Sequence, residues 1–303
     1  MIEMIETSER GEKDASGAPR IVASLLGHRQ VEMAILCLGS LLRRSADPLA
    51  LRLHDDGSLT AEDRERLAAA LGDPAVILRG AANERVADVL ARHPALAAFR
   101  RGNPLALKLI DAVLYAGDEL AYCDTDVLFL RRFQGLFPTG TAETAFMADR
   151  QNAYSLRSWH LLQHRRLRLP ARVNSGIIHF PTAAWDPDLL EWYLGRPEML
   201  FAPVWVEQTA WALLGQAAGC QLFDPRQIAI PDAGPKAGPE VVALHFVAPV
   251  RHLLPLYAES AESAESEEAT DAALVAVRRR PAGSCTALNL AAGEIRRRWA
   301  RLV

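Results

Sequence analysis

The sequence predicts an α/β fold in which a mixed, mainly parallel central sheet is covered by helices on both faces. Short apolar runs alternate with segments of helical periodicity through the first half of the chain, and this alternation is typical of parallel sheets. The run at residues 120–123 is apolar throughout, as expected for a strand that is buried on both of its faces. The length of 303 residues is sufficient for one large domain with a substantial core.

Composition and charge exclude several classes of protein. With 50% hydrophobic and 23% charged residues, the chain has the composition of a globular protein. A formal net charge of −3 argues against a nucleic-acid-binding protein, which needs basic residues to neutralise phosphates. The four cysteines are widely spaced and contain no C-x-x-C pair, so we expect reduced thiols, no zinc site and a cytoplasmic protein.

The N-terminal region is expected to contain no membrane-spanning segment. Residues 1–18 are polar and acidic and lack the apolar stretch of a signal peptide, so we predict a disordered tail. Residues 21–42 are more apolar, but charged residues around Arg29 interrupt them. We therefore predict a strand at 21–26 and a helix at 31–44.

Two further strand–helix pairs follow. We predict strands at residues 50–54 and 75–78, each followed by a helix, the second of them at 83–92. Thr60 and Asp63 have the spacing of a capping box, which indicates that the first of these helices begins there.

The segment 105–133 contains the most informative pattern in the chain. Apolar residues recur at helical spacing over 105–114, where only Lys108 and Asp111 are polar. We expect this helix to end at Gly117, because glycine is the usual residue after a helix C-terminus. The apolar strand follows directly.

Two carboxylates come immediately after this strand. Asp124 and Asp126 are separated by one residue, and the chain then returns to apolar residues. Ligands bind beyond the C-terminal ends of parallel strands, and two acids there repel each other unless a cation lies between them. Because Mg²⁺ and Mn²⁺ prefer carboxylate oxygens and often carry phosphates, the pair predicts a metal–diphosphate site. A D-x-D sequence in a turn without a metal is the alternative.

The second half of the chain is less regular. We predict strands at residues 144–148, 175–180 and 241–246, and helices at 188–194 and 207–217.

The C-terminal part of the chain differs in composition. An acidic repeat of the tripeptide AES occupies residues 257–271 and predicts a linker, a loop or a charged helix. Residues 272–303 predict a helical extension with arginine clusters at 278–280 and 296–298. These arginines either lie at helix ends and pair with the acidic segment, or contact a partner or the surface of a membrane.

Four features, in order along the chain, carry a resemblance to a known family. They are the D-T-D sequence with the helix before it, the N-S-G sequence at Asn174, the E-Q pair at Glu207 and the H-F pair at His245. Together they resemble nucleotide-diphospho-sugar glycosyltransferases of the GT-A fold, in the group of glycogenin-like enzymes and bacterial lipopolysaccharide galactosyltransferases. The resemblance covers residues 19–256 and implies a single Rossmann-like catalytic domain of the GT-A type.

The resemblance implies a metal site beside a donor site. Asp124, Asp126 and His245 would hold Mn²⁺ or Mg²⁺, and the imidazole suits Mn²⁺ somewhat better. Asp124 would also lie near the ribose of the donor, and Lys108 would lie close to the donor. From the residues alone, His245 could instead be a histidine of the core, and Lys108 could form a surface pair with Asp111.

Other residues are implied to contact the substrates. Asn174 would form hydrogen bonds with hydroxyl groups of the sugar or the acceptor, and Gly176 would let a ligand approach the backbone. Glu207 and Gln208 would face the transferred sugar. Arg251 is nearest to the position of a lysine that reaches the diphosphate in the family, and an arginine can supply the same charge. Without the resemblance, Asn174 and Gly176 are expected in an ordinary turn before a buried strand. Glu207 and Gln208 are then expected in an exposed first turn of a helix.

The resemblance implies transfer of a sugar from a nucleotide-diphosphate donor to a hydroxyl group of an acceptor, with retention of the anomeric configuration. We expect the donor to be a UDP-sugar; the sequence does not identify the acceptor. Two alternatives stay open. A haloacid-dehalogenase-like phosphohydrolase also has a D-x-D sequence after an apolar strand, although normally after the first one. A sugar-nucleotide-binding protein without catalytic activity could have the same fold.

Overall fold

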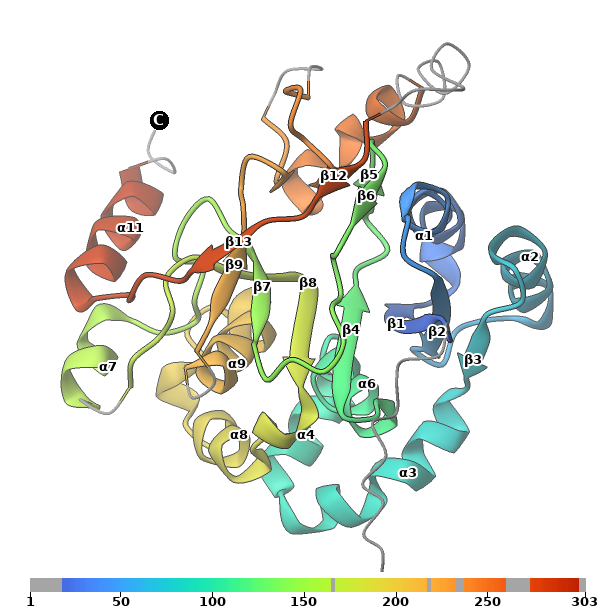
Figure 1. Cartoon of the computed structure of the whole chain (residues 1–303). Coiled ribbons are helices and arrows are strands. Elements are labelled where there is room, and N and C mark those ends of the chain that lie inside the picture. The colour runs from blue at the N-terminus through green and yellow to red at the C-terminus, as the bar shows by residue number, and fades with distance from the viewer. Residues whose placement is uncertain (1–17, 165–166, 217–218, 233–236, 260–272, 300–303) are drawn as a thin grey trace, which may run out of the picture.

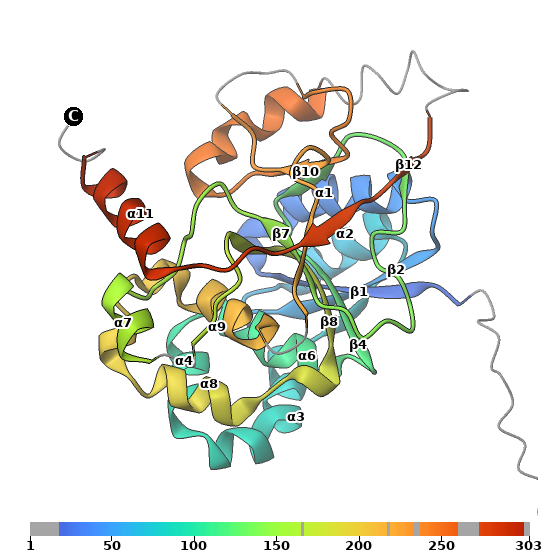
Figure 2. The same ribbon diagram turned by 60° about the vertical axis from the view of Figure 1, so that its left-hand side comes forward.

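The computed structural model describes residues 18–164, 167–216, 219–232, 237–259 and 273–299 of the chain. Its central feature is an eight-stranded sheet with the strand order β13-β9-β7-β8-β4-β1-β2-β3, and helices cover both faces (Figures 1 and 2). The strands of this sheet are β1 (Arg20–Leu26), β2 (Leu49–Asp55), β3 (Ala75–Ile77), β4 (Glu119–Cys123), β7 (Ala145–Ala148), β8 (Val173–Pro181), β9 (Gln221–Phe223) and β13 (Arg279–Pro281). The predicted α/β fold with a mixed, mainly parallel sheet is confirmed.

Four adjacent strands form a parallel block of the sheet. β1 pairs in parallel with β2 and with β4, and β2 pairs in parallel with β3. Side chains of β4 alternate between two core clusters, with Leu120 and Tyr122 in one and Ala121 and Cys123 in the other. Because both faces are covered, β4 is apolar over its buried length, and polar residues begin where it ends.

β8 lies between β4 and β7 and runs antiparallel to both. The register of its pairing with β7 shifts between Phe146 and Met147, and Asn174 lies opposite Met147 after this shift. Irregularities of this kind change the direction of neighbouring side chains and are frequent next to functional sites. This one lies at the end of β8 that borders the C-terminal end of β4, where Cys123 is opposite Ile177.

A smaller sheet brings a distant segment of the chain to the same place. β5 (Val127–Phe129) pairs antiparallel with β11 (Ala243–His245), and His245 lies opposite Val127. Because Val127 directly follows Asp126 in the sequence, this ladder places His245 beside the acidic pair. β10 (Ile228–Ala229) completes the small sheet by pairing in parallel with β11.

The helices cover the two faces of the main sheet as separate groups. α1 and α2 contribute to the core cluster on one face together with β5, whereas α3 to α6, α8 and α9 contribute to the cluster on the other face. Within the described part of the chain, no helix combines the length and the apolar character that crossing a membrane requires. The helices are α1 (Val31–Arg44), α2 (Ala61–Leu71), α3 (Arg79–Arg92), α4 (Pro94–Gly102), α5 (Ala106–Leu109), α6 (Asp111–Tyr115), α7 (Ser158–Gln163), α8 (Pro187–Leu194), α9 (Val206–Gly215) and α11 (Ala287–Trp299).

Local signals explain the start and the end of α2. The hydroxyl of Thr60 accepts a hydrogen bond from the backbone N–H of Asp63 at 3.1 Å, and the carboxylate of Asp63 accepts one from the backbone N–H of Thr60 at 2.9 Å. The predicted capping box is therefore confirmed. Gly72 follows the helix in the left-handed region, with φ of 75°.

The helix predicted before Gly117 differs in the structure. It is divided at Ile110 into α5 and α6. The C-cap of α6 is Ala116, and Gly117 directly follows it as predicted, but its φ is not positive. The break separates two buried polar residues, Lys108 and Asp111, whose partners lie in different elements. α4 is an additional helix that the periodicity did not predict, although it begins with a proline as many helices do.

The C-terminal part is not the purely helical extension that its composition predicts. β12 (Val275–Ala276) pairs in parallel with β6 (Phe133–Gln134), and β13 pairs antiparallel with β9, before α11 begins. Pairing with strands that are distant in sequence decides this structure, and local composition does not reveal such partners. Residues 260–271 of the acidic repeat lie outside the described residues. The division of the chain into domains stays a prediction.

Candidate metal centre

The backbone of the turn at residues 124–126 is tied to two other segments. The backbone N–H of Asp124 donates to the carbonyl of Gly176 at 2.8 Å, and the carbonyl of Asp126 accepts from the backbone N–H of Phe246 at 2.8 Å. These bonds connect the turn to β8 on one side and to the end of β11 on the other. Three of the sequence features that carry the family resemblance therefore meet at the C-terminal end of β4.

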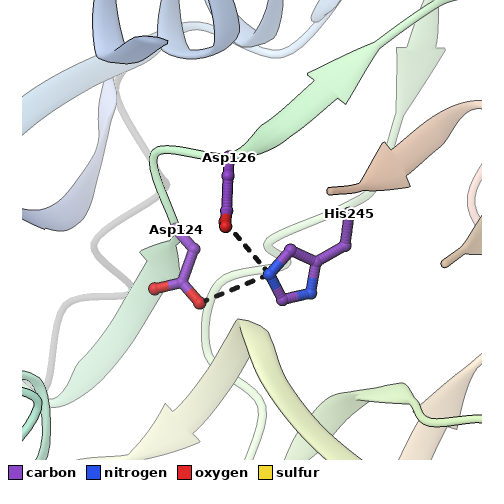
Figure 3. A group of neighbouring side chains, drawn as sticks. All are labelled: Asp124, Asp126 and His245. Atoms are coloured by element: carbon purple, nitrogen blue, oxygen red, sulfur yellow. Dashed lines mark ion pairs between the residues drawn. The ribbon is translucent and has the colours of Figure 1, made fainter. Parts of the chain in front are cut away.

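His245 faces both carboxylates of the turn, as Figure 3 shows. Its Nε2 lies 3.0 Å from Oδ1 of Asp126 and 3.7 Å from Oδ2 of Asp124. One ligand atom from each residue can be chosen so that all three lie within 4.8 Å of one another. Two carboxylate oxygens and one imidazole nitrogen form a donor set that suits Mn²⁺ or Mg²⁺. The three side chains can therefore hold a divalent cation.

Asp126 is ionised because cationic groups outweigh the effect of its burial. Burial acts to raise the pKa of Asp126, but the charges and hydrogen bonds of His245 and Arg251 lower it to about 2. Burial alone would lower the pKa of His245. The charge of Asp126 and its hydrogen bond outweigh burial, so the pKa of His245 is raised above its ordinary value. Nη2 of Arg251 donates to Oδ2 of Asp126 at 2.6 Å, and the Arg251 side chain is 48% exposed. Asp126 thus has the charge that a metal ligand needs at neutral pH.

Lys108 and Tyr122 hold the carboxylate of Asp124. Nζ of Lys108 lies 3.0 Å from Oδ2 of Asp124, and the hydroxyl of Tyr122 donates to Oδ1 at 2.9 Å. The expected alternative, a surface pair between Lys108 and Asp111, was wrong because Lys108 is only 1% exposed. Asp111 forms a buried ion pair with Arg100 instead, at 2.6 Å.

Glu207 and Gln208 lie at the start of α9, and both side chains are buried. Oε2 of Glu207 accepts from the hydroxyl of Ser175 at 2.9 Å. Oε1 of Glu207 lies 3.7 Å from Nζ of Lys108 and has no hydrogen bond among the described residues. Burial raises the pKa of Glu207, and Lys108 opposes this effect. Nε2 of Gln208 donates to the carbonyl of Ala153 at 2.8 Å.

Asn174 and Gly176 contact His245, and both come from β8. Oδ1 of Asn174 lies 3.0 Å from Nδ1 of His245 and accepts from the backbone N–H of Gly176 at 2.9 Å. A Cβ atom added to Gly176 would lie 2.4 Å from Cε1 and Nδ1 of His245. The close approach at this glycine is therefore to the imidazole ring, whereas the resemblance implied an approach to a ligand.

Replacing Gly176 with alanine is expected to displace the imidazole of His245. Because the added Cβ would lie at 2.4 Å from the ring, we expect the free energy of unfolding to fall by about 1–3 kcal/mol. We also expect Mn²⁺ to bind about tenfold more weakly or worse. Calorimetric titration with Mn²⁺ and denaturant unfolding measure these effects. Gly117→Ala is the control, because a Cβ there meets nothing within 4 Å; an unchanged Mn²⁺ affinity in Gly176→Ala would contradict the prediction.

A pocket of about 180 Å³ opens beside the acidic turn. It lies at the C-terminal end of β1, and its lining combines apolar side chains with Asp124 and Asp126. Its wall includes Leu26, Gln30, Met33, Asp56, Tyr122 and Arg251. The sequence alone did not predict Tyr122 as a site residue. Its position two residues before Asp124 places the two side chains on the same face of the chain, and this spacing is the signal that could have identified it.

Many solved structures match this chain, among them those of two enzymes that transfer sugars. Mouse xyloside xylosyltransferase 1 matches with a TM-score of 0.53 and 11% sequence identity, over 77% of this chain and 99% of that one. The galactosyltransferase LgtC, in complex with donor and acceptor sugar analogues, matches with a TM-score of 0.53 and 14% identity, over 83% and 97%. No protein-family model and no curated protein sequence matches the chain. At these identities the likeness concerns the fold alone, and it confirms the GT-A-type fold that the resemblance implied.

Proposed function

We propose that the chain is a metal-dependent glycosyltransferase that transfers a sugar from a nucleotide-diphosphate donor to a hydroxyl group of an acceptor. The observation that carries this proposal is the convergence of Asp124, Asp126 and His245, whose ligand atoms lie within 4.8 Å of one another. The fold shared with two enzymes that transfer sugars supports it. A UDP-sugar as the donor and retention of the anomeric configuration are finer parts of the proposal, which rest on the sequence resemblance.

Asp124, Asp126 and His245 would hold Mn²⁺ or Mg²⁺, and the imidazole nitrogen favours Mn²⁺. The bound ion would act as a Lewis acid that neutralises the negative charge on the departing diphosphate. The residues fit such an ion because Asp126 is ionised and because Nε2 of His245 faces both carboxylates.

Positive side chains around the acidic turn would assist the departure of the diphosphate. The buried ammonium group of Lys108 contacts Asp124, and Asp124 lines the pocket. Arg251 is half exposed on the outer side of Asp126, so its guanidinium can turn toward the oxygens of a diphosphate. Both charges would stabilise the negative charge that develops on the diphosphate in the transition state.

Glu207 and Gln208 would orient the transferred sugar or the acceptor. Oε1 of Glu207 is buried without a hydrogen bond among the described residues. Its neighbour is the ammonium group of Lys108 at 3.7 Å, and a carboxylate oxygen has the capacity to accept a further hydrogen bond from a hydroxyl group of a substrate. Gln208 follows Glu207 on α9 and is held by the carbonyl of Ala153.

Binding of UDP is expected to depend on Mn²⁺. If UDP is present at a hundred times its dissociation constant, it should stabilise the folded protein by about 2.7 kcal/mol. Thermal unfolding with UDP and Mn²⁺, compared with UDP plus a chelator and with Mn²⁺ alone, measures this effect. Release of UDP from a UDP-sugar across a panel of acceptor sugars then tests for transfer.

Two other results of this experiment would favour the alternative functions. Hydrolysis of phosphate esters without any response to UDP would favour a phosphohydrolase. Binding of UDP-sugars without release of UDP would favour a protein that binds sugar nucleotides and does not catalyse transfer.

A further inference from the structure

The hydrogen bonds of Asn174 point to a role other than the sugar contact that the resemblance implies. We propose that Asp149 and Asn174 are positioning residues that hold the imidazole of His245 in the orientation of a metal ligand. The inference rests on the proposed function in one respect, because the orientation matters for catalysis only if a metal binds there. It is carried by hydrogen bonds between side chains that are almost completely buried.

The imidazole of His245 can offer one nitrogen to a metal only if the other nitrogen carries the proton. Nδ1 of His245 lies 3.0 Å from Oδ1 of Asn174, and a carboxamide oxygen can only accept. The proton of the neutral ring is therefore held on Nδ1. Nε2, which lies 3.0 Å from Oδ1 of Asp126, is then the nitrogen available to a metal. Partners of this kind behind a histidine ligand fix both its tautomer and its orientation.

The carboxamide of Asn174 is itself held in one orientation. Oδ1 accepts from two donors, Nδ1 of His245 and the backbone N–H of Gly176. Nδ2 donates to Oδ2 of Asp149 at 3.3 Å. A flipped carboxamide would place its NH₂ group against the backbone N–H of Gly176 and its oxygen against the carboxylate of Asp149. Both contacts would be unfavourable, so these two groups fix the orientation independently of the tautomer of His245.

The loop that contains Asp149 is held by several hydrogen bonds, so the Asp149 carboxylate can fix the position of the Asn174 side chain. Its backbone N–H donates to the carbonyl of Arg172 at 2.7 Å, and its Oδ1 accepts from the backbone N–H of Gln151 at 3.1 Å. Nε of Arg172 donates in return to the carbonyl of Asp149 at 2.6 Å. Arg172 lies in the left-handed region with φ of 62°, a conformation that these contacts maintain. Asp149 follows β7 at the register shift that places Asn174 opposite Met147.

Most of the hydrogen-bonding positions of Asn174 are used within the protein. Asn174 is 4% exposed, Asp149 is 8% exposed and His245 is 5% exposed. Both acceptor positions of the carboxamide oxygen and one of its two N–H groups are already used by the protein. The side chain of Asn174 therefore orients His245 and has little capacity left to bind a substrate.

Asn174→Ala is expected to weaken the binding of Mn²⁺ about 10- to 100-fold in the absence of any nucleotide, the range found when such partners are removed. Calorimetric titration with MnCl₂ measures this dissociation constant. Asn152→Ala is the matched control, because Oδ1 of Asn152 accepts from the backbone N–H of Arg172 in the same loop and does not contact His245. If Asn174→Ala binds Mn²⁺ like the wild type but binds a UDP-sugar more weakly at saturating Mn²⁺, the residue is a substrate contact and the proposal is overturned.

If Asn174→Ala does not fold, exchanging the side chains at positions 149 and 174 provides a second test. In the double variant Asp149→Asn with Asn174→Asp, the carboxylate stands next to His245 and Gly176 and the carboxamide can donate to it, so each donor again meets an acceptor. We expect this variant to bind Mn²⁺ no more weakly than the wild type. Binding weakened to the level expected for Asn174→Ala would overturn the proposal.

A measurement without metal separates this proposal from the proposed function. In ¹⁵N-resolved NMR spectra of the metal-free protein, the Nδ1–H proton of His245 should exchange slowly with water. It should be lost in Asn174→Ala and retained in Asn152→Ala. If the wild type shows this pattern but does not bind Mn²⁺, the positioning role stands and the metal-dependent function fails. If the wild type binds Mn²⁺ while the Nδ1–H signal does not depend on Asn174, only the positioning role fails.

Discussion

Replacing Asp126 with alanine is expected to abolish the metal-dependent binding of UDP and to reduce sugar transfer by about 10²- to 10³-fold or more. Asp126 is the carboxylate closest to Nε2 of His245, and its low pKa keeps it ionised at neutral pH. Without it, the remaining ligands are one carboxylate and one imidazole, too few to hold a divalent cation firmly. UDP binding measured with and without Mn²⁺, followed by UDP release from a UDP-sugar, measures both effects.

Asp118→Ala is a suitable control for this experiment. Asp118 precedes β4, at the opposite end of the strand from the acidic turn, and its side chain is exposed. We expect this variant to bind UDP and Mn²⁺ like the wild type. Unchanged, metal-dependent UDP binding in Asp126→Ala would rule out the metal assignment.

Replacing Lys108 with methionine is expected to lower the free energy of unfolding by about 3–5 kcal/mol, because a buried ion pair loses only one partner. Methionine fills a similar volume, but Asp124 and Glu207 then lack the cation between them. Burial raises the pKa of Glu207 and Lys108 opposes this, so the variant should raise that pKa further. A carboxyl group with a higher pKa in the folded state binds more protons there than in the unfolded chain, and stability therefore falls as the pH rises.

The loss of stability in Lys108→Met should accordingly be smaller near pH 5 than near pH 8. The pH range over which this stability is lost begins at the ordinary pKa of glutamate, 4.5, and extends upward to the raised pKa of Glu207. Denaturant unfolding at several pH values, with Arg92→Met as an exposed cationic control, measures this dependence. A loss that is small at every pH, or that grows as the pH falls, would contradict the account of the buried cluster around Lys108.

The fold was predictable from the sequence because its central strands have local signatures. The capping box at Thr60 and the apolar run before Asp124 both have a local cause, and the structure confirms both. The acidic pair could be placed at a strand end for the same reason. Its partner His245 could not be found from spacing, because only the ladder between β5 and β11 brings it there; the family resemblance supplied it.

Contacts between distant segments explain what the sequence did not predict. The polar residues Lys108 and Asp111 are neighbours on a helical pattern, yet each is paired with a different element. The roles of Asn174 and Asp149 depend on a register shift between β7 and β8, which leaves no local pattern in the sequence. Helical periodicity also cannot reveal that the C-terminal part pairs with β9 and β6 before it turns into a helix.

β13 covers the edge of the main sheet that β9 would otherwise form. β9 would otherwise be the outermost strand, and its free N–H and C=O groups could pair with another molecule. β13 occupies them, with a proline at its end, and Arg279 packs over the ring of Phe223 while its guanidinium binds the carbonyls of Gly135 and Leu136. A segment that looks like an appendage in the sequence thereby shields the open flank of the sheet from self-association.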